Sequence, residues 1–339
     1  MAAPSTISQD PLAGALAPAG GSVPGSAELE AVIPNAIPRA LGAVAPSRRF
    51  LGPLGAALVT MRPRQWSKNA LLVAAAGAAG ALGRDDTSVR LALATVAFCL
   101  LASGIYALND VRDVREDRLH PRKCHRPVAA GRVGLRTATA LGIALILSGL
   151  AMCLLVRPLL GLVGAGYVLL TLSYTLVWRR FVIVDLVAIA GGFVLRAVAG
   201  GVAAPVPLSR WFVVVVTAAA ILVAAGKRHA ELQRASLSGG SKRRVLERYT
   251  QQALRYILLG SAAAAITAYC IWAFRVPTVH GFPWRPLTIA PFALCMARYG
   301  LLVRDGAGEA PEELILSDRW LVLGFAGWLL LFSLGVAAS

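Results

Sequence analysis

The chain has 339 residues, of which 57% are hydrophobic and 15% are charged, and its mean hydropathy is +0.66. Soluble domains carry ~25% charged residues, so this composition excludes a single soluble domain and predicts a membrane protein. A net charge of +17 would suit nucleic-acid binding in a soluble protein. Here the basic residues fall between apolar segments, where they set topology and attract anionic substrates or lipids, so we expect no nucleic-acid partner.

The first part of the chain, residues 1–46, is rich in Ala, Pro, Gly and Ser and shows no hydrophobic periodicity. Its first basic residue is Arg39, so no charged segment precedes an apolar run as it would in a signal peptide. We therefore expect a disordered, cytoplasmic tail over residues 1–46 and one helical domain over residues 47–339.

The remainder of the chain contains apolar runs of the length that crosses a bilayer as a helix, which is ~20 residues. We predict nine spans and therefore an all-α polytopic membrane protein with nine transmembrane helices. The predicted spans are residues 69–83, 89–108, 136–156, 158–178, 183–202, 211–226, 253–274, 286–303 and 319–337.

The basic residues are distributed unevenly between the two sides that these spans define. With the N-terminus inside, 27 of the 34 Lys and Arg residues fall on the inner side and 6 on the outer side. Cytoplasmic loops carry such an excess of positive charge. We therefore expect a multi-pass plasma-membrane protein with a cytoplasmic N-terminus and an external C-terminus.

A group of acidic residues directly follows the second predicted span. On a helix, residues four apart are neighbours, so Asn109, Asp113 and Asp117 form one stripe with Asp110 beside it. Carboxylates this close repel one another unless a cation lies between them, and Mg²⁺ takes one or two carboxylates together with phosphate oxygens and water. The structural alternative is a salt-bridge network with the arginines interleaved between them.

Basic residues lie close to this stripe in two cytoplasmic loops. Pro121 ends the helix, and Lys123 and Arg126 are then expected to return toward the carboxylates. In the loop after the sixth span, Lys227 and Arg228 sit at the membrane interface, where they could hold a phosphate. The alternative for both loops is that their charges only fix the topology.

Further polar residues lie within or beside the predicted spans. Asp185 begins the fifth span and Arg196 lies within it. Ionisable residues at such depth in a membrane are candidates for a functional site. Arg64 and Lys68 precede the first span, where they could contact a phosphate or anchor the helix.

The layout as a whole resembles the UbiA superfamily of intramembrane prenyltransferases over about residues 60–338. The shared features are nine spans, an Asn-Asp-x-x-Asp-x-x-x-Asp motif after the second span and a polar loop after the sixth. The resemblance implies a UbiA-like bundle with a cytoplasm-facing active-site cavity, and it implies that the first motif binds a Mg²⁺-diphosphate. The residues that match this motif are Asn109, Asp110, Asp113 and Asp117.

The second loop departs from the aromatic prenyltransferases of this family, which carry a second Asp-rich motif there. This chain has Gly-Lys-Arg-His-Ala-Glu at 226–231, with Glu231 as its acidic residue. It is similar in this respect to the decaprenyl-phosphate phosphoribosyltransferase branch of actinobacterial cell-wall synthesis. The motifs that carry this similarity are Arg-Pro-Arg-Gln-Trp-x-Lys-Asn (62–69), Asp-Arg-x-His-Pro-x-Lys (117–123), Arg-Pro-Val-Ala-Ala-Gly (126–131), Val-Asp with Gly-Phe-Val-Leu-Arg-Ala (184–197) and Gly-Lys-Arg (226–228).

This resemblance implies a Mg²⁺-dependent transfer of phosphoribose from phosphoribosyl diphosphate to a polyprenyl phosphate lipid. The residues expected to be catalytic are Asp110, Asp113 and Asp117. The residues expected to bind substrate are Asn109, Lys68, Arg64, Lys123, Arg126, Asp185, Arg196, Lys227, Arg228 and Glu231.

Two other functions and the assembly state stay open at this point. An aromatic or quinone-type prenyltransferase of the same fold is disfavoured by the basic second loop. A transporter usually carries its polar residues near the bilayer midplane between internal repeats, whereas here they lie at helix ends and no repeat is visible. The sequence does not decide whether the protein forms a homo-oligomer.

Overall fold

The computed structural model describes residues 52–83, 85–177, 182–237, 250–275, 282–308 and 311–337. The tail predicted over residues 1–46 lies outside the described residues. All regular secondary structure within the described ranges is helical, as the apolar runs predicted.

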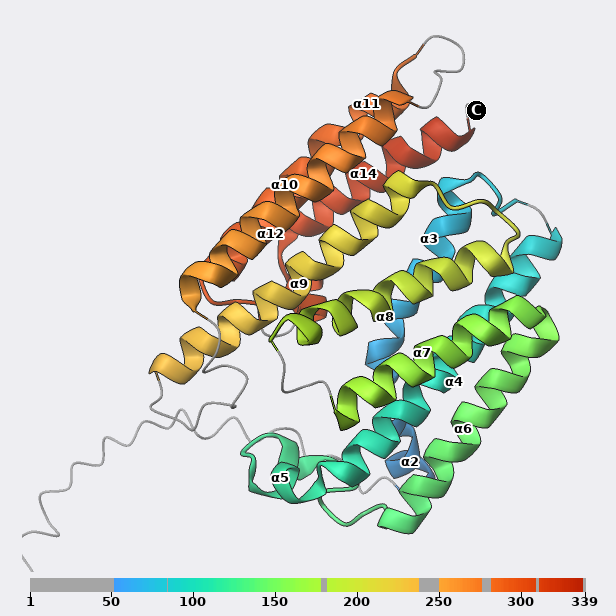
Figure 1. Cartoon of the computed structure of the whole chain (residues 1–339), viewed down its shortest axis with the longest axis vertical. Coiled ribbons are helices and arrows are strands. Elements are labelled where there is room, and N and C mark those ends of the chain that lie inside the picture. Colours follow the sequence, from blue (N-terminus) through green and yellow to red (C-terminus); the bar gives the residue numbers. More distant parts are fainter. Residues whose placement is uncertain are drawn as a thin grey trace, which may run out of the picture. The chain divides into compact units, whose positions relative to one another are not determined.

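Eight long helices make up most of the described chain (Figure 1). They are α4 (Asp85–Arg112), α6 (Leu135–Val156), α7 (Pro158–Leu176), α8 (Val182–Ala203), α9 (Arg210–Leu237), α10 (Gln251–Arg275), α12 (Ile289–Arg304) and α14 (Arg319–Ala337). The shorter helices are α2 (Pro53–Met61), α3 (Ala70–Ala78), α5 (Val114–Leu119), α11 (Trp284–Leu287) and α13 (Pro311–Ser317), with 3₁₀ helices η2 (Pro63–Asn69) and η3 (Lys123–His125).

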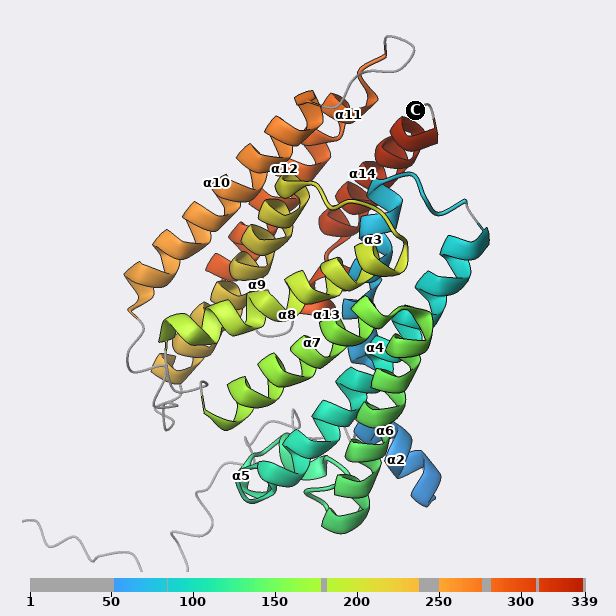
Figure 2. The same cartoon turned by 45° about the vertical axis from the view of Figure 1, so that its right-hand side comes forward.

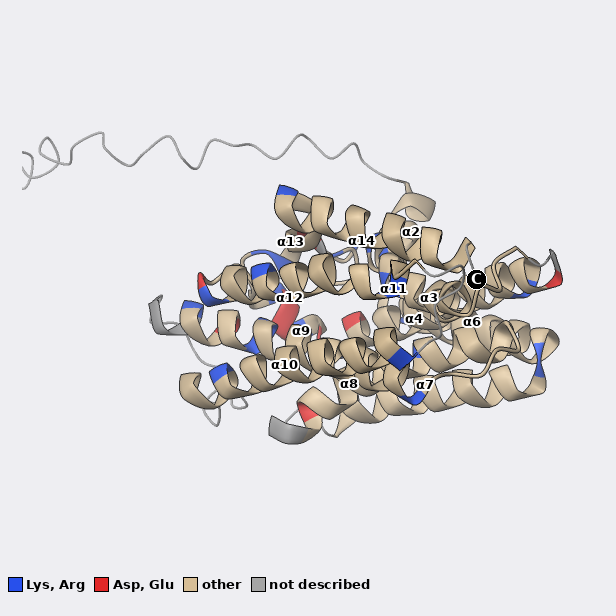
Figure 3. Ribbon diagram, turned by 90° about the horizontal axis from the view of Figure 1, so that it is seen from above, with Lys and Arg blue, Asp and Glu red and all other residues tan. Residues whose placement is uncertain are grey.

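Eight helical stretches within the described residues are long and apolar enough to cross a membrane, and the protein is an integral membrane protein. They coincide with the eight spans predicted from residue 89 onward. Where a first span was predicted over 69–83, the structure has the nine-residue helix α3. At 1.5 Å per residue α3 is only ~14 Å long, less than the ~30 Å hydrocarbon core of a bilayer. Figure 3 shows that charged residues gather mainly toward the helix ends.

Small residues let neighbouring helices approach closely at two places. A Cβ added at Gly104 of α4 would lie 2.6 Å from the carbonyl oxygen of Gly142 on α6. A Cβ added at Gly200 of α8 would collide with the carbonyl oxygen of Leu72 on α3. Close backbone packing at small residues is a common way for membrane helices to associate. We refer to these contacts as the α4–α6 seam and the α3–α8 seam.

The apolar core is divided between two groups of helices. One cluster joins α3, α4, α6, α7 and α8 around Phe98 and Leu101, which are fully buried. A second cluster joins α8, α9, α10, α12 and α14 around Leu254 and Val303. Figure 2 shows α10 and α12 beside α9 and α14 beside α12, in agreement with their contacts. Helix α8 contributes to both clusters, so it links the helices that carry the polar residues described next.

Candidate functional site

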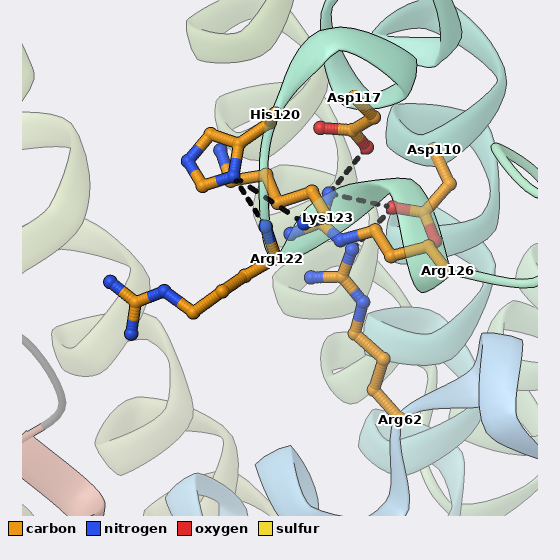
Figure 4. Close-up of polar contacts among 7 residues, drawn as sticks. All are labelled: Arg62, Asp110, Asp117, His120, Arg122, Lys123 and Arg126. Atoms are coloured by element: carbon orange, nitrogen blue, oxygen red, sulfur yellow. Dashed lines mark hydrogen bonds and ion pairs between the residues drawn. The ribbon is translucent and has the colours of Figure 1, made fainter. Parts of the chain in front are cut away.

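The first polar cluster lies where α4 ends and the chain turns through α5 and η3 (Figure 4). Arg126 donates hydrogen bonds to Asp110 Oδ1 at 3.2 Å and to Asp117 Oδ2 at 2.6 Å. Arg62, from the turn between α2 and η2, also pairs with Asp110 Oδ1. We call these four residues the α4 carboxylate site. Both carboxylates are buried, whereas both arginines keep more than a quarter of their side-chain surface exposed.

The predicted acidic stripe is present, although the helix that carries it is interrupted. Helix α4 ends at Arg112, and Asp113 is the N-cap residue of α5, where its side chain makes no capping hydrogen bond. The amide of Asp113 still donates to the Asn109 carbonyl at 2.9 Å, and the amide of Asp117 donates to the Asp113 carbonyl at 2.8 Å. These bonds keep residues 109, 113 and 117 one above another across the break.

Arg62 reaches Asp110 from an unusual backbone conformation. Its φ of 54° places it in the left-handed region, which non-glycine residues seldom occupy. The turn that holds Arg62 also stacks its guanidinium on the ring of Tyr106, at 4.9 Å from the ring centroid. Backbone strain of this kind persists only where surrounding contacts impose it, and it concentrates at functional sites.

His120 shapes the turn that brings Arg126 back to the carboxylates. Its Nδ1 accepts hydrogen bonds from the amides of Arg122 at 3.2 Å and Lys123 at 3.4 Å. Partial burial, together with the nearby Lys123 and Arg122 cations, lowers the pKa of His120, which favours the neutral, accepting imidazole. The Arg122 side chain points away from the cluster (Figure 4).

A second polar cluster joins α7, α8 and α9, and we call it the α8–α9 site. The Arg228 guanidinium donates from Nε to Asp185 Oδ2 at 2.6 Å and from its second terminal nitrogen to Asp185 Oδ1 at 2.7 Å. It also donates to Glu231 Oε2 at 2.6 Å, while the hydroxyl of Tyr174 donates to Asp185. Arg228 and Asp185 are both buried. The structure therefore ties Arg228 to two carboxylates.

A third cluster surrounds Arg196 within the bundle. Arg196 donates to Asn69 Oδ1 at 2.8 Å, to the Tyr167 hydroxyl at 2.7 Å and to the carbonyl oxygen of Gly192 at 3.0 Å. Asn69 in turn donates to Cys99 Sγ at 3.2 Å. Arg196 therefore lies apart from Asp185, with which it shares helix α8.

The remaining predicted site residues differ in their exposure to solvent. Lys68 is half-buried and donates to Gln65 Oε1 at 2.5 Å, while Arg64 and Lys227 are exposed. Asn109, Asp113 and Lys123 are half-buried.

Four residues in these clusters were not among the predicted site residues, namely Arg62, Asn69, Tyr167 and Tyr174. Arg62 and Asn69 are the two ends of the 62–69 motif, so the motif could have identified them as site residues. The two tyrosines are seven residues apart in an apolar span, and their common helix face was a weaker signal.

The α4 carboxylate site has the chemistry that a magnesium diphosphate requires. Two carboxylates, from Asp110 and Asp117, converge on one cation, the guanidinium of Arg126. Among the described residues no group of three or more His, Cys, Asp or Glu side chains is arranged to hold a metal by itself. A magnesium ion bound here would need oxygens from its substrate, and such mixed coordination is the usual one for Mg²⁺ in phosphate chemistry. The donor set therefore fits Mg²⁺ bound together with a diphosphate.

Comparison with known proteins gives consistent matches over the helical part of the chain. The sequence model of the UbiA prenyltransferase family matches residues 70–322. The chain is 38% identical over 281 residues to a decaprenyl-phosphate phosphoribosyltransferase of Mycolicibacterium smegmatis, covering 79% of this chain and 88% of that protein. It is 38% identical over 274 residues to a protein of the same name from Corynebacterium glutamicum, covering 79% and 82%.

Solved structures show the same fold at lower sequence identity. A UbiA homolog from Archaeoglobus fulgidus bound to GPP and Mg²⁺ superposes with a TM-score of 0.61 and 16% identity, covering 82% of this chain and 99% of that one. A UbiA homolog from Aeropyrum pernix K1 gives a TM-score of 0.57 at 20% identity, covering 80% and 97%.

Proposed function

Because the chain belongs to the UbiA prenyltransferase family, we propose that it transfers 5-phosphoribose from phosphoribosyl diphosphate to a polyprenyl phosphate such as decaprenyl phosphate. The observation that carries this proposal is its 38% identity to the Mycolicibacterium protein, which extends over 79% of the chain. The four-residue cluster at the end of α4 supports it, because buried carboxylates beside partly exposed arginines suit a charged diphosphate.

The proposed reaction exchanges one C–O bond for another at the ribose. An oxygen of the lipid phosphate forms a bond to C1, and the bond from C1 to the diphosphate oxygen breaks, so diphosphate leaves with the electron pair. The attacking phosphate is already anionic, so no general base is needed. The protein's task is then to hold the two phosphorylated substrates together and to exclude water, which accounts for a large part of many enzymatic accelerations.

Magnesium is the proposed cofactor at the α4 carboxylate site. The residues that would hold it with the diphosphate are Asn109, Asp110, Asp113 and Asp117. When bound, the ion neutralises charge that develops on the leaving diphosphate, an effect worth several kcal/mol in metal-assisted reactions. Arg126 and Lys123 would then hold phosphate oxygens.

The other predicted site residues are proposed to act around this centre. Arg64, Lys68 and Lys227 supply positive charge for phosphate groups at the membrane surface. Asp185 and Glu231 hold Arg228 in place, so we assign these three residues to positioning the wall of the substrate site.

Membership of the UbiA family is also the basis for the proposed membrane arrangement. Nine crossings follow if η2 and α3 together form the first one, which gives a cytoplasmic N-terminus, an external C-terminus and a cytoplasm-facing cavity in the plasma membrane. The product is then made on the cytoplasmic side, as a precursor for cell-wall arabinan.

The test is an incubation of membranes that contain the full chain with phosphoribosyl diphosphate, Mg²⁺ and a polyprenyl phosphate, followed by mass analysis of the lipids. We expect a polyprenyl-phospho-phosphoribose that disappears with EDTA or with Asp113→Asn. Glu116→Gln is the matched control, because Glu116 is an exposed acidic residue of the same short helix. If that lipid is absent while a prenyl diphosphate is consumed with an aromatic acceptor, the proposed reaction is wrong and the family assignment stands.

A further inference from the structure

Arg196 is a buried cation within a membrane-spanning helix. Its side chain projects from α8, and the residue is only 6% exposed. Its partners Asn69 and Tyr167 are 0% and 4% exposed, so the cluster is enclosed by η2, α7 and α8. Placing an arginine at such depth is costly, and in membrane proteins such residues usually serve ligands, ions or protons.

The charge of Arg196 has no acidic counterpart among the residues that the structure describes. Its hydrogen-bond acceptors are an amide oxygen, a phenol and a backbone carbonyl, and all three are neutral. Two rings, Tyr167 and Phe193, lie 4.7 and 5.6 Å from the guanidinium carbon. A guanidinium has five N–H donors, so these contacts occupy three of them. Arg228, on the neighbouring helix, is instead neutralised by Asp185 and Glu231.

The Arg196 cluster is connected to the α4 carboxylate site by a short rigid segment. Arg62, just before η2, pairs with Asp110, and Asn69, the last residue of η2, pairs with Arg196. A 3₁₀ helix rises ~2.0 Å per residue, so the seven residues of η2 span ~14 Å.

Helix α4 gives a second measure of the same separation. Asp110 and Cys99, which contacts Asn69, are eleven residues apart on α4, which corresponds to ~16 Å. Tyr106 lies between them on the same helix, with the Arg62 guanidinium 4.9 Å from its ring centroid. We call the polar residues along these two segments, Asp110, Arg62, Tyr106, Asn69 and Arg196, the polar path.

We propose that Arg196 is a binding site for a phosphate monoester, at the inner end of the polar path that begins at Asp110. A dianionic phosphate would supply the charge that Arg196 lacks and would accept from its two remaining N–H groups, because arginine binds phosphate through paired hydrogen bonds. This inference rests on the proposed function, in which each substrate carries one phosphate monoester, the 5-phosphate of the donor and the phosphate of the lipid. Both share the chemistry that Arg196 recognises.

The experiment measures binding without turnover. Purified full-length protein in nanodiscs is titrated in EDTA with two probes, ribose 5-phosphate and farnesyl phosphate, and affinities are read by calorimetry. Arg196→Gln removes the charge, and Arg196→Lys keeps it without the planar fork. Arg157→Gln is the matched control, because Arg157 is a half-buried arginine that donates to the carbonyl of Val202 at 3.0 Å.

We expect Arg196→Gln to weaken one probe at least tenfold, Arg196→Lys to weaken it less, and Arg157→Gln to leave it within threefold. Loss of ribose 5-phosphate binding assigns the donor's phosphate to Arg196, and loss of farnesyl phosphate binding assigns the lipid's phosphate. Equal affinities of wild type and folded Arg196→Gln for both probes would overturn the proposal. If Arg196→Gln does not fold, unchanged affinities in Arg196→Lys overturn it instead.

Mg²⁺-diphosphate binding and product formation are followed in parallel to separate the two proposals. Normal lipid product without any Arg196-dependent binding would overturn this inference alone. Arg196-dependent binding with no phosphoribosyl lipid would overturn the proposed reaction and leave the monoester site in place.

Discussion

Two arginines in this protein each bridge a pair of carboxylates, and they differ in how far water reaches them. Arg126, between Asp110 and Asp117, has 29% of its side chain exposed, whereas Arg228, between Asp185 and Glu231, has 7% exposed. An exposed guanidinium can be replaced by another cation and solvated by water. A buried one cannot leave without stranding its carboxylates in a low-dielectric interior. The two sites therefore differ in the exposure of the bridging arginine, because Asp110, Asp117 and Asp185 are all buried.

The largest effect is expected from breaking the buried pair. Arg228→Met leaves Asp185 without its bidentate partner, and removing one member of a buried pair costs ~3–5 kcal/mol of unfolding free energy. Chemical denaturation in detergent measures this loss. The double variant Asp185→Leu/Arg228→Met should recover part of it, because neither charge is then left alone. A loss below ~1 kcal/mol in the single variant is typical of a surface ion pair, and it would contradict the contrast between Arg228 and Arg126.

Breaking the Arg126–Asp117 pair should impair activity rather than stability. Asp117→Asn keeps the shape and a hydrogen-bond acceptor for Arg126 but removes a charge that the proposed metal would need. We expect turnover to fall ~10²-fold or more, as when one preorganised electrostatic group is removed from an active site. Product formation and denaturation are measured on the same preparation. The comparison fails if Asp117→Asn loses as much stability as Arg228→Met while its turnover is retained.

The backbone of Arg62 offers a smaller test of the α4 carboxylate site. Arg62→Gly and Arg62→Ala both delete the guanidinium that pairs with Asp110. The left-handed conformation, with φ of 54°, costs an alanine ~1 kcal/mol and a glycine almost nothing. The glycine variant should therefore be the more stable of the two by about that amount in denaturation. Equal stabilities would show that the turn relaxes once the ion pair is gone.

The smallest expected effect is the response of the His120 turn to pH. The folded pKa lies below the ordinary value of 6.5, so the stabilising contribution of neutral His120 is complete above pH 6.5 and is lost as pH falls through the folded pKa. Amide exchange of Arg122 and Lys123 should accelerate, relative to model peptides, between pH 7 and pH 5. His120→Ala, measured over the same range, should show no such step.

The sequence predicted the long helices well because charged residues or prolines bound most of the apolar runs. Eight spans agree with the observed helices, whereas the 69–83 run contains the short helix α3. Its alanines and glycines are apolar but carry little information about where a helix starts or ends. The family and the resemblance to the decaprenyl-phosphate phosphoribosyltransferases are confirmed.

Site geometry could be predicted only where partners are close in sequence. The return of Arg126 to the acidic stripe spans nine residues to Asp117, and the turn at Pro121 made it predictable. Arg228 pairs with Asp185 across 43 positions, and Arg196 pairs with Asn69 across 127. Such pairs form when helices pack together, so they cannot be predicted from the spacing of residues along the chain. The roles of the individual site residues remain predictions.

The glycine seams have a consequence for the lipid substrate. At Gly104 and Gly200 the α4–α6 and α3–α8 boundaries lack room for even one added methyl group. An isoprenoid chain carries a methyl branch on every unit, so neither boundary can let it through. The tail of the proposed polyprenyl phosphate would therefore have to enter the surrounding membrane between other helices, so Gly104 and Gly200 limit its possible directions of exit.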